Sequence, residues 1–251
     1  MRVRAHSRWH GRWVAVVVLA AALAAGCGGG AEQGAEPEQG GPAAEEKEMD
    51  QVTVQLDWLP RGNHGMFYVA KEKGWFAEQG IEVTEIQPGK GSAITMQIVG
   101  KNQADFGFGD LPTLAVARSQ GIPVVALAAV NQESPLAMCT IESRHGLDNP
   151  EDLKGLRIGV TAGGSTFIFH QALLEANGLS RSDLKERSVT PPYESFLLEG
   201  HVDVVPCYID AEVPILEAHA GEPLSILLGL DWGYDVLGSG LLTSEKMIDE
   251  D

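Results

Sequence analysis

Blocks of apolar and polar residues follow one another from residue 52 onward, and their period predicts alternating strands and helices. Period-two alternation or a short apolar run predicts strands at residues 52–58, 81–87, 104–110, 123–130, 156–160, 202–210 and 224–230, some with the turn that follows. Apolar residues at helical spacing predict helices at residues 66–73, 75–79, 93–103, 111–120, 167–177, 194–200 and 213–219. This alternation predicts an α/β protein with mainly parallel sheets.

The strand and helix pattern restarts after a break near residues 131–145, which indicates two lobes. The run 123–130 is apolar without interruption, as is typical of a strand covered on both faces. In such folds a ligand binds beyond the carboxyl ends of the strands, often between lobes. The loops expected to carry a site are residues 57–65, 107–113, 161–166, 206–212 and 231–235.

The first fifty residues have a different composition, typical of export and tethering. Four arginines precede an apolar run at 14–25, which has the length of a signal-peptide core and is too short to span a membrane. The sequence AAGC at Cys27 resembles a bacterial lipobox, so we expect a signal peptide at 1–26 and lipidation of Cys27; an ordinary secretory signal is the alternative. Residues 27–50 lack large apolar residues and are expected to form a flexible tether.

The net charge of −17, from 35 acidic and 18 basic residues, argues against a nucleic-acid partner. Three cysteines are too few for a disulfide scaffold. The sequence contains no GxSxG, HExxH or paired CxxC motif, and its histidines are scattered. We therefore expect a protein that binds a ligand without catalysis, metal or cofactor.

A series of motifs resembles one known family. These motifs are LDWLPRGNHGMFYVAKEKGWFAEQGIEV (56–83), GKGSAITMQIVGKNQADFGFGD (89–110), LKGLRIGVTAGGSTFIFHQALLEANGL (153–179) and LLEGHVDVVPCYIDAE (197–212). In this order they resemble the NMT1/THI5-like periplasmic binding proteins, the solute-binding components of ABC importers.

The resemblance implies a two-lobed, hinged fold of the type II periplasmic-binding-protein class. Lobe 1 is expected at 51–135, lobe 2 at 136–228, and a return segment to lobe 1 at 229–251. Family members continue for some tens of residues beyond the position of Met247, with helices that pack on lobe 1. We therefore expect a shortened chain whose first lobe exposes apolar surface.

The loop after the first strand carries four candidate ligand contacts. Trp58 is expected to stack on a flat heterocycle, although it could instead pack in the core. Asp57 precedes it, and Asn63 offers a donor and an acceptor to an aminopyrimidine edge, or is a turn residue. His64 is expected to donate to a ring nitrogen or to cap a helix. Asp110 is a further candidate at the end of its strand.

The remaining candidates lie in the second half of the chain. Gly164, Ser165 and Thr166 open a helix after a strand, where backbone N–H groups favour a polar or anionic group, or where Ser165 or Thr166 caps the helix. Tyr208 is expected to stack on the ligand and Glu212 to accept from its amine. The candidate set, completed by an aromatic side chain near the hinge, is Asp57, Trp58, Asn63, His64, Asp110, Gly164, Ser165, Thr166, Tyr208, Glu212 and Trp232.

The resemblance leaves the ligand open. The family branch that carries DW and NH after the first strand and a later Tyr and Glu binds pyrimidine precursors of thiamine. Binders of riboflavin, sulfonate and nitrate are close neighbours in the family. The Trp and Asn that the family carries between Tyr208 and Glu212 are Ile209 and Asp210 here. The expected protein is a lipoprotein on the outer face of a bacterial cell membrane that delivers its solute to an ABC permease. A lipoprotein that only senses the ligand and a pyrimidine-synthesising enzyme of the same fold are the alternatives.

Two cysteines lie in the body of the chain. Cys139 lies in the segment near residues 131–145 where the strand and helix pattern breaks, Cys207 lies well beyond it, and we expect the two to fall in different lobes. A bridge between lobes would prevent hinge motion. We therefore predict two free, buried thiols.

Overall fold

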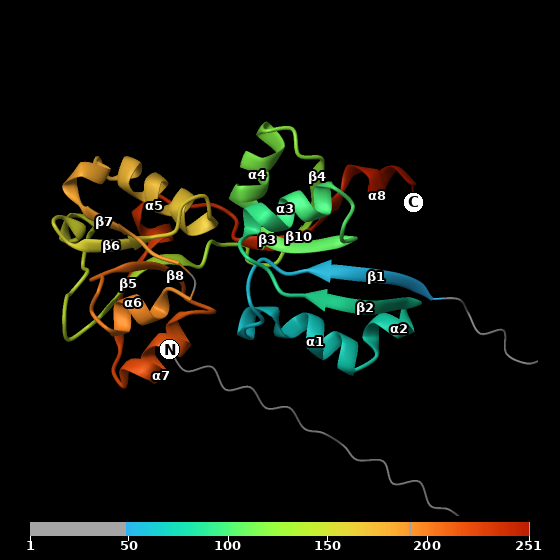
Figure 1. The fold of residues 1–251 in the computed structure, drawn as a ribbon, viewed down its shortest axis with the longest axis horizontal. Coiled ribbons are helices and arrows are strands. Elements are labelled where there is room, and N and C mark those ends of the chain that lie inside the picture. The colour runs from blue at the N-terminus through green and yellow to red at the C-terminus, as the bar shows by residue number, and fades with distance from the viewer. Residues whose placement is uncertain (1–48, 191, 251) are drawn as a thin grey trace, which may run out of the picture. The chain divides into compact units, whose positions relative to one another are not determined.

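The computed structural model describes residues 49–190 and 192–250, and its strands form three sheets (Figure 1). The signal peptide, Cys27 and nearly all of the expected tether lie outside the described residues. No helix within the described ranges is long and apolar enough to cross a membrane.

The largest sheet has five strands in the order β2-β1-β3-β10-β4. Its strands are β1 (Asp50–Gln55), β2 (Ile81–Gln87), β3 (Phe106–Asp110), β4 (Val124–Ala129) and β10 (Ser239–Ser244). Strand β1 is parallel to β2 and β3, whereas β10 runs antiparallel between β3 and β4. The sheet therefore takes four strands from residues 50–129 and its fifth from the end of the chain.

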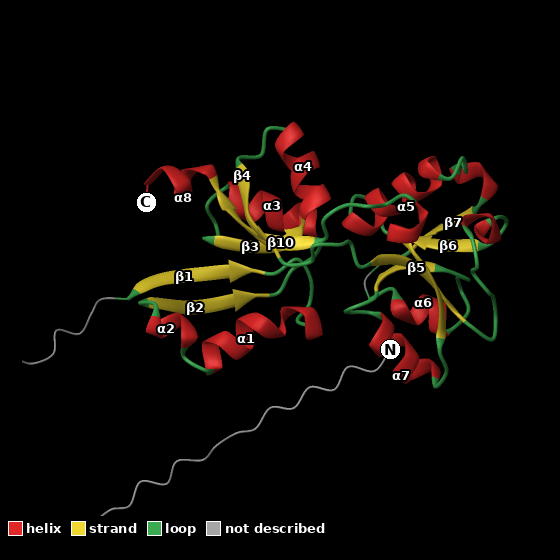
Figure 2. Ribbon diagram, turned by 180° about the vertical axis from the view of Figure 1, so that it is seen from behind, coloured by secondary structure: helices red, strands yellow, loops and turns green. Residues whose placement is uncertain are grey.

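Helices cover both faces of this sheet, as Figure 2 shows. One face carries α1 (Gly65–Glu72) and α2 (Trp75–Glu78), and the other carries α3 (Ser92–Gly100) and α4 (Leu111–Ser119). On the first face Phe67 packs with Val54 and Phe108, and on the second Met96 packs with Leu242. This packing follows from the alternation of side chains across the strands. Helix α8 (Glu245–Glu250) follows β10.

The other two sheets are built from residues 136–228. Strands β8 (Val205–Tyr208), β5 (Leu136–Ile141) and β9 (Leu224–Leu228) form an antiparallel sheet in that order. Strands β6 (Arg157–Val160) and β7 (Lys185–Ser188) form a parallel pair, which an isolated parallel bridge from Ile158 to Val204 joins to the segment before β8. The α/β class is confirmed, with sheets that mix parallel and antiparallel pairs.

Strand β5 is buried along its whole length, because helices pack on both of its faces. Met138 faces the cluster that contains Phe169 of α5 (Ser165–Ala176). Ala137 and Cys139 face the opposite cluster, with Leu197 and Leu216. The helices on this second side are α6 (Glu194–Leu198) and α7 (Val213–Ala220). Single turns of 3-10 helix lie between these elements, at Gly62–His64, Pro150–Leu153, Arg181–Asp183 and Gly229–Trp232.

Two predictions about this fold are wrong. The run 123–130 is not covered on both faces, because β4 is the edge strand of its sheet and Leu127 is 42% exposed. The two body cysteines are not free thiols in different lobes. Strand β5 pairs directly with β8, which brings the Cα atoms of Cys139 and Cys207 to 6.1 Å, and a disulfide joins them within one sheet.

Candidate functional site

A cavity of about 180 Å³ lies where loops from the five-stranded sheet meet loops from residues 136–228. The loops that follow β1, β6 and β8 all border it, together with the start of α3. This is the expected position for a ligand site in an α/β fold. Of the candidates named from the sequence, the cavity is lined by Asp57, Trp58, Asn63, His64, Gly164, Ser165, Thr166, Tyr208 and Glu212.

The loop after β1 is held in place by a close backbone approach. The backbone N–H of Gly89 donates to the carbonyl oxygen of Trp58 over 2.9 Å, and that of Gly91 donates to the carbonyl of Asp57. A Cβ atom at position 89 would lie 2.2 Å from the carbonyl oxygen of Leu56, so only glycine fits there. This contact fixes the backbone that presents Asp57 and Trp58 to the cavity.

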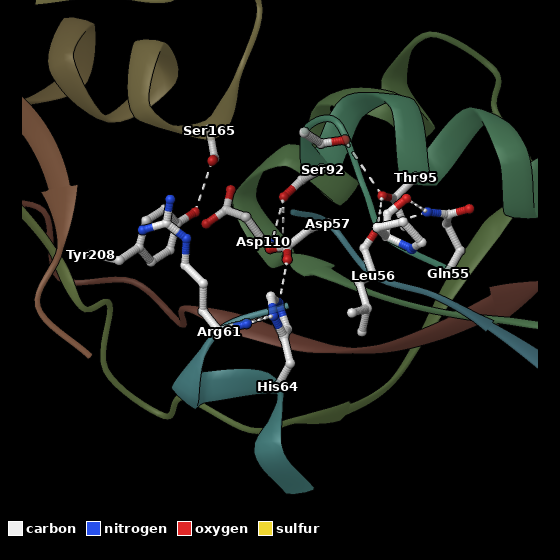
Figure 3. A network of polar contacts seen from close by, with 12 residues as sticks. Gln55, Leu56, Asp57, Arg61, His64, Ser92, Thr95, Asp110, Ser165 and Tyr208 are labelled. Carbon is white, nitrogen blue, oxygen red and sulfur yellow. Dashed lines mark hydrogen bonds and ion pairs between the residues drawn. The ribbon is translucent and has the colours of Figure 1, made fainter. Parts of the chain in front are cut away.

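The buried polar side chains below this loop form a network with a defined direction (Figure 3). The backbone N–H of Arg61 donates to Nδ1 of His64 over 3.2 Å, so Nε2 of His64 carries the proton and donates to Asp57 over 2.8 Å. Ser92 contacts the other oxygen of Asp57 at 3.5 Å. Because His64 is fully buried and donates to Asp57, its ring holds the Asp57 carboxylate in place.

Asp110 does not line the cavity, because its side chain turns back to cap α4. One of its oxygens accepts from the backbone N–H of Thr113 over 2.9 Å and from the hydroxyl of Thr113 over 2.6 Å. Burial raises the pKa of Asp110 to about 6, against the opposing effect of the Thr113 hydrogen bonds. One oxygen of Asp110 therefore serves as a helix cap beneath the site, its other oxygen has no partner among the described residues, and the predicted ligand contact stays a prediction.

Trp232 also lies outside the cavity lining. It ends the 3-10 turn after β9 and packs, partly buried, on the cluster that contains Leu136 and Phe169. Its carbonyl oxygen accepts from the side-chain amide of Asn177 over 2.9 Å. This aromatic residue therefore supports the connection out of β9, and the predicted contact of Trp232 with a ligand stays a prediction.

The glycine-rich loop before α5 joins the cavity through Ser165 and Tyr208. The Tyr208 hydroxyl donates to Oγ of Ser165 over 2.8 Å. Burial, followed by the charges of Asp110 and Asp57, raises the pKa of Tyr208 well above its usual value, so its hydroxyl stays protonated. The helix cap itself is Gly164, which has no side chain to offer, so neither Ser165 nor Thr166 acts as the N-cap.

An ion cluster that the sequence analysis missed borders the same cavity. The guanidinium of Arg61 forms an ion pair with Glu194, and its Nη1 lies 3.4 Å from Oε1 of Glu212. The side chains of Arg61, Glu194 and Glu212 are 8%, 10% and 5% exposed. The signal for Arg61 was its place between Trp58 and His64 in one loop. No sequence signal pointed to Glu194, because it lies 133 residues from Arg61 along the chain.

Glu212 is held at the N-terminal end of α7, where its Oε2 accepts from the backbone N–H of Tyr208 over 2.8 Å. Burial raises the pKa of Glu212 to about 7, although the charge of Arg61 and the hydrogen bond from Tyr208 act in the opposite direction. This carboxyl group can therefore bind a ligand either as a proton donor or as an acceptor near neutral pH.

Several polar atoms around the cavity have no hydrogen-bond partner among the described residues. They are donors at Trp58 Nε1 and Arg61 Nη1, and acceptors at Asn63 Oδ1 and Glu194 Oε2. Buried polar groups of this kind normally find partners, so such atoms mark places where a bound molecule can complete the hydrogen bonding. The indole of Trp58 adds an aromatic face, with its ring centre 6.3 Å from that of Tyr193. Within the described ranges no group of three or more histidine, cysteine and acidic residues could hold a metal ion.

The architecture of the described residues is that of the periplasmic solute-binding proteins. The alkanesulfonate-binding protein SsuA from Xanthomonas axonopodis pv. citri, solved with bound MOPS, aligns with a TM-score of 0.62 over 83% of this chain and 69% of that chain. The two sequences are 17% identical, so this likeness establishes the fold alone. Residues 61–251 match the NMT1/THI5-like family model, and the chain belongs to the NMT1/THI5-like family.

Named relatives fall into two kinds. The formylaminopyrimidine-binding protein of Halalkalibacterium halodurans is 30% identical over 84% of this chain, and the riboflavin-binding protein RibY of Chloroflexus aurantiacus is 26% identical over 80%. The 4-amino-5-hydroxymethyl-2-methylpyrimidine phosphate synthase THI13 of Saccharomyces cerevisiae is 25% identical over 70%. The chain spans 64%, 57% and 52% of these three relatives, respectively.

Proposed function

We propose that this protein is the solute-binding component of an ABC importer and captures a small planar heterocycle. The observation that carries the proposal is a single cavity in which strand-end loops gather an indole, an amide and a carboxyl group. Trp58 offers a face for stacking, Asn63 an amide edge, and Glu212 a carboxyl group for an exocyclic amine. The formylaminopyrimidine-binding relative supports a pyrimidine precursor of thiamine as the favoured ligand.

The size of the cavity supports a single ring over a larger ligand. Its volume of about 180 Å³ is smaller than the roughly 300 Å³ at which sites for drug-sized ligands begin. A substituted pyrimidine fits that space, whereas the three fused rings and sugar chain of riboflavin require a wider opening. Riboflavin and sulfonates remain the alternative ligands, in keeping with the named relative and the structural neighbour.

The proposed setting is the outer face of a bacterial cell membrane. The basic and apolar start of the chain would direct export, and lipidation of Cys27 would anchor the protein through a tether at 27–50. Two lobes, at 51–135 with 229–251 and at 136–228, would close on the solute by hinge bending and present it to a permease. Mass spectrometry of the N-terminal peptide, purified from membranes, tests the lipid on Cys27.

Catalysis is the second candidate, and the yeast relative named as a pyrimidine phosphate synthase is the observation that favours it. Under this alternative the chain would release a pyrimidine product when incubated with iron, detectable by mass spectrometry. Under the binding proposal the same incubation yields no new pyrimidine.

A fluorescence titration of the full chain tests the binding proposal. Adding 4-amino-5-hydroxymethyl-2-methylpyrimidine is expected to quench tryptophan fluorescence, because Trp58 lines the cavity. The variant Trp58→Phe should lose most of the change. Trp75→Phe is the matched control, because Trp75 is 53% exposed on α2 and does not line the cavity, so this variant should keep the quench.

The possible results of this titration distinguish a wrong choice of ligand from a wrong choice of function. Quenching by riboflavin or by methanesulfonate alone would change the ligand class and leave the solute-binding role in place. Calorimetry with the same three compounds provides an independent measurement. If none of them binds the chain by either method, the proposed function loses its support.

A further inference from the structure

The buried charges beside the cavity are unequal in number, and this imbalance bears on the chemistry of the ligand. Among the described residues that line the cavity, the buried cation is the guanidinium of Arg61, whose side chain is 8% exposed, whereas Lys90 lines the cavity from an exposed position. The guanidinium of Arg61 faces two carboxylates, Glu194 and Glu212, that are buried to a similar extent. A third buried carboxylate, Asp57, lines the same cavity with His64 as its partner. The formal charge of the Arg61, Glu194 and Glu212 cluster is therefore −1 when both acids are ionised.

The geometry shows that the charge of Arg61 is already committed within the protein. One terminal nitrogen, Nη2, is paired with Oε1 of Glu194, and the other, Nη1, lies 3.4 Å from Oε1 of Glu212. Charges at such separations interact strongly once water is excluded. An arginine in a ligand cavity commonly indicates an anionic ligand, because its planar fork suits carboxylates and phosphates. Here both terminal nitrogens lie within ion-pair distance of a protein carboxylate, although Nη1 makes no hydrogen bond within the described residues.

We propose that Glu194 and Glu212 together neutralise Arg61 and thereby make the cavity select a neutral or cationic N–H-bearing heterocycle and reject anionic solutes. This inference rests on the proposed function, because it names the chemical class that the same cavity binds. Glu212 accepts from the N–H groups of the ligand. Glu194 does not line the cavity, and it acts on specificity through Arg61 as a positioning residue.

The cavity would discriminate between ligands mainly through the free-energy cost of burying an anionic ligand beside the carboxylates. A sulfonate or carboxylate in the cavity would add a negative charge beside two acids that share one guanidinium, and unpaired buried charge is costly. An amino-heterocycle brings donors, which match the acceptor that lacks a partner on the cavity lining, Asn63 Oδ1. Removing one carboxylate should therefore change which ligands bind, beyond changing how tightly they bind.

The variant Glu194→Gln tests this by removing one negative charge and keeping the size of the side chain. Calorimetry on the full chain would compare 4-amino-5-hydroxymethyl-2-methylpyrimidine with the anion methanesulfonate. In the unmodified protein methanesulfonate should bind at least tenfold more weakly than the pyrimidine. In Glu194→Gln the ratio of the two affinities should shift toward methanesulfonate by tenfold or more, because Arg61 is left with one carboxylate.

The matched control is Glu199→Gln, which removes the same charge at the end of the same helix. The side chain of Glu199 is 63% exposed and pairs with His201, so its loss should leave the ratio of affinities unchanged. Circular dichroism and thermal unfolding establish that both variants are folded. Should Glu194→Gln unfold, titrating the unmodified protein with 2-methylpyrimidine-5-carboxylate provides the second measurement, and tight binding of this anion would overturn the proposal.

Failure of the inference and failure of the proposed function give different results. If the unmodified protein binds the pyrimidine but Glu194→Gln and Glu199→Gln change the ratio equally, the inference is wrong and the solute-binding role stands. If the unmodified protein prefers methanesulfonate, the charge argument is wrong for this cavity. If it binds neither compound nor riboflavin, the proposed function is wrong as well.

Discussion

At the scale of single residues, Glu212 links the site to pH. Burial raises the pKa of Glu212 from 4.5 to about 7. The folded chain therefore keeps a proton on Glu212 between pH 4.5 and about 7, where the unfolded chain has released it. The free energy of unfolding is expected to fall as pH rises through this window. Asp110 contributes in the same direction up to its own pKa of about 6. Urea denaturation at a series of pH values measures the slope.

The contribution of Glu212 can be isolated by substitution. Glu212→Gln should reduce the slope, most clearly between pH 6 and 7, where Asp110 contributes less. Glu199→Gln, at an exposed position, should keep the slope of the unmodified protein. An unchanged slope in Glu212→Gln would show that another group carries the pH dependence.

Part of the site was predictable from the sequence because it depends on strand ends. Trp58 and Tyr208 each follow or end a strand, and strand ends converge at one edge in this class of fold. Arg61 and Glu194 were missed because their pairing joins residues 133 positions apart. That Asp110 and Trp232 lie outside the cavity lining could not be foreseen for a related reason, since the direction of a side chain beyond a strand depends on the next helix or cluster.

At the scale of elements, strands with a clear apolar period were predictable and those without one were not. The strand predicted at 81–87 has the bounds of β2, and the helix predicted at 111–120 ends one residue beyond α4. Strand β7 has the sequence KERS, and β10 begins with serine and glycine, so neither shows an apolar pattern. Strand β5 is apolar except for Thr140, but it lies in the segment taken as the boundary between lobes.

The disulfide between β5 and β8 stabilises the element that carries Tyr208. Cys139 and Cys207 are fully buried and enclose a loop with a sequence separation of 68. Replacing both with alanine is expected to lower the free energy of unfolding by about 4 kcal/mol, because the unfolded chain regains the entropy of an open loop. Urea denaturation measures the loss, and reducing the unmodified protein should cause a similar one. A loss below about 1 kcal/mol, with no effect of reductant, would indicate free thiols.

At the scale of the whole described body, two segments connect the five-stranded sheet to residues 136–228. They run through residues 130–135 and 229–238, and they contact each other where they cross. The backbone N–H of Gly238 donates to the carbonyl of Asn131 over 2.9 Å, and the backbone N–H of Val130 donates to the carbonyl of Ser239 over 2.9 Å. Under the proposed function, this crossing is where the lobes would bend.

Gly238 allows the two connecting segments to lie this close. A Cβ atom at this position would come within 2.7 Å of both Cβ of Asn131 and Cδ of Pro135. Gly238→Ala should therefore force the segments apart and lower the free energy of unfolding by about 1–3 kcal/mol. Gly146→Ala is the control, because a Cβ atom there meets nothing within 4 Å, and its effect should stay within about 0.5 kcal/mol. Equal losses in the two variants, measured by urea denaturation, would show that the segments separate freely and that their contact does not restrain the sheets on either side of the cavity.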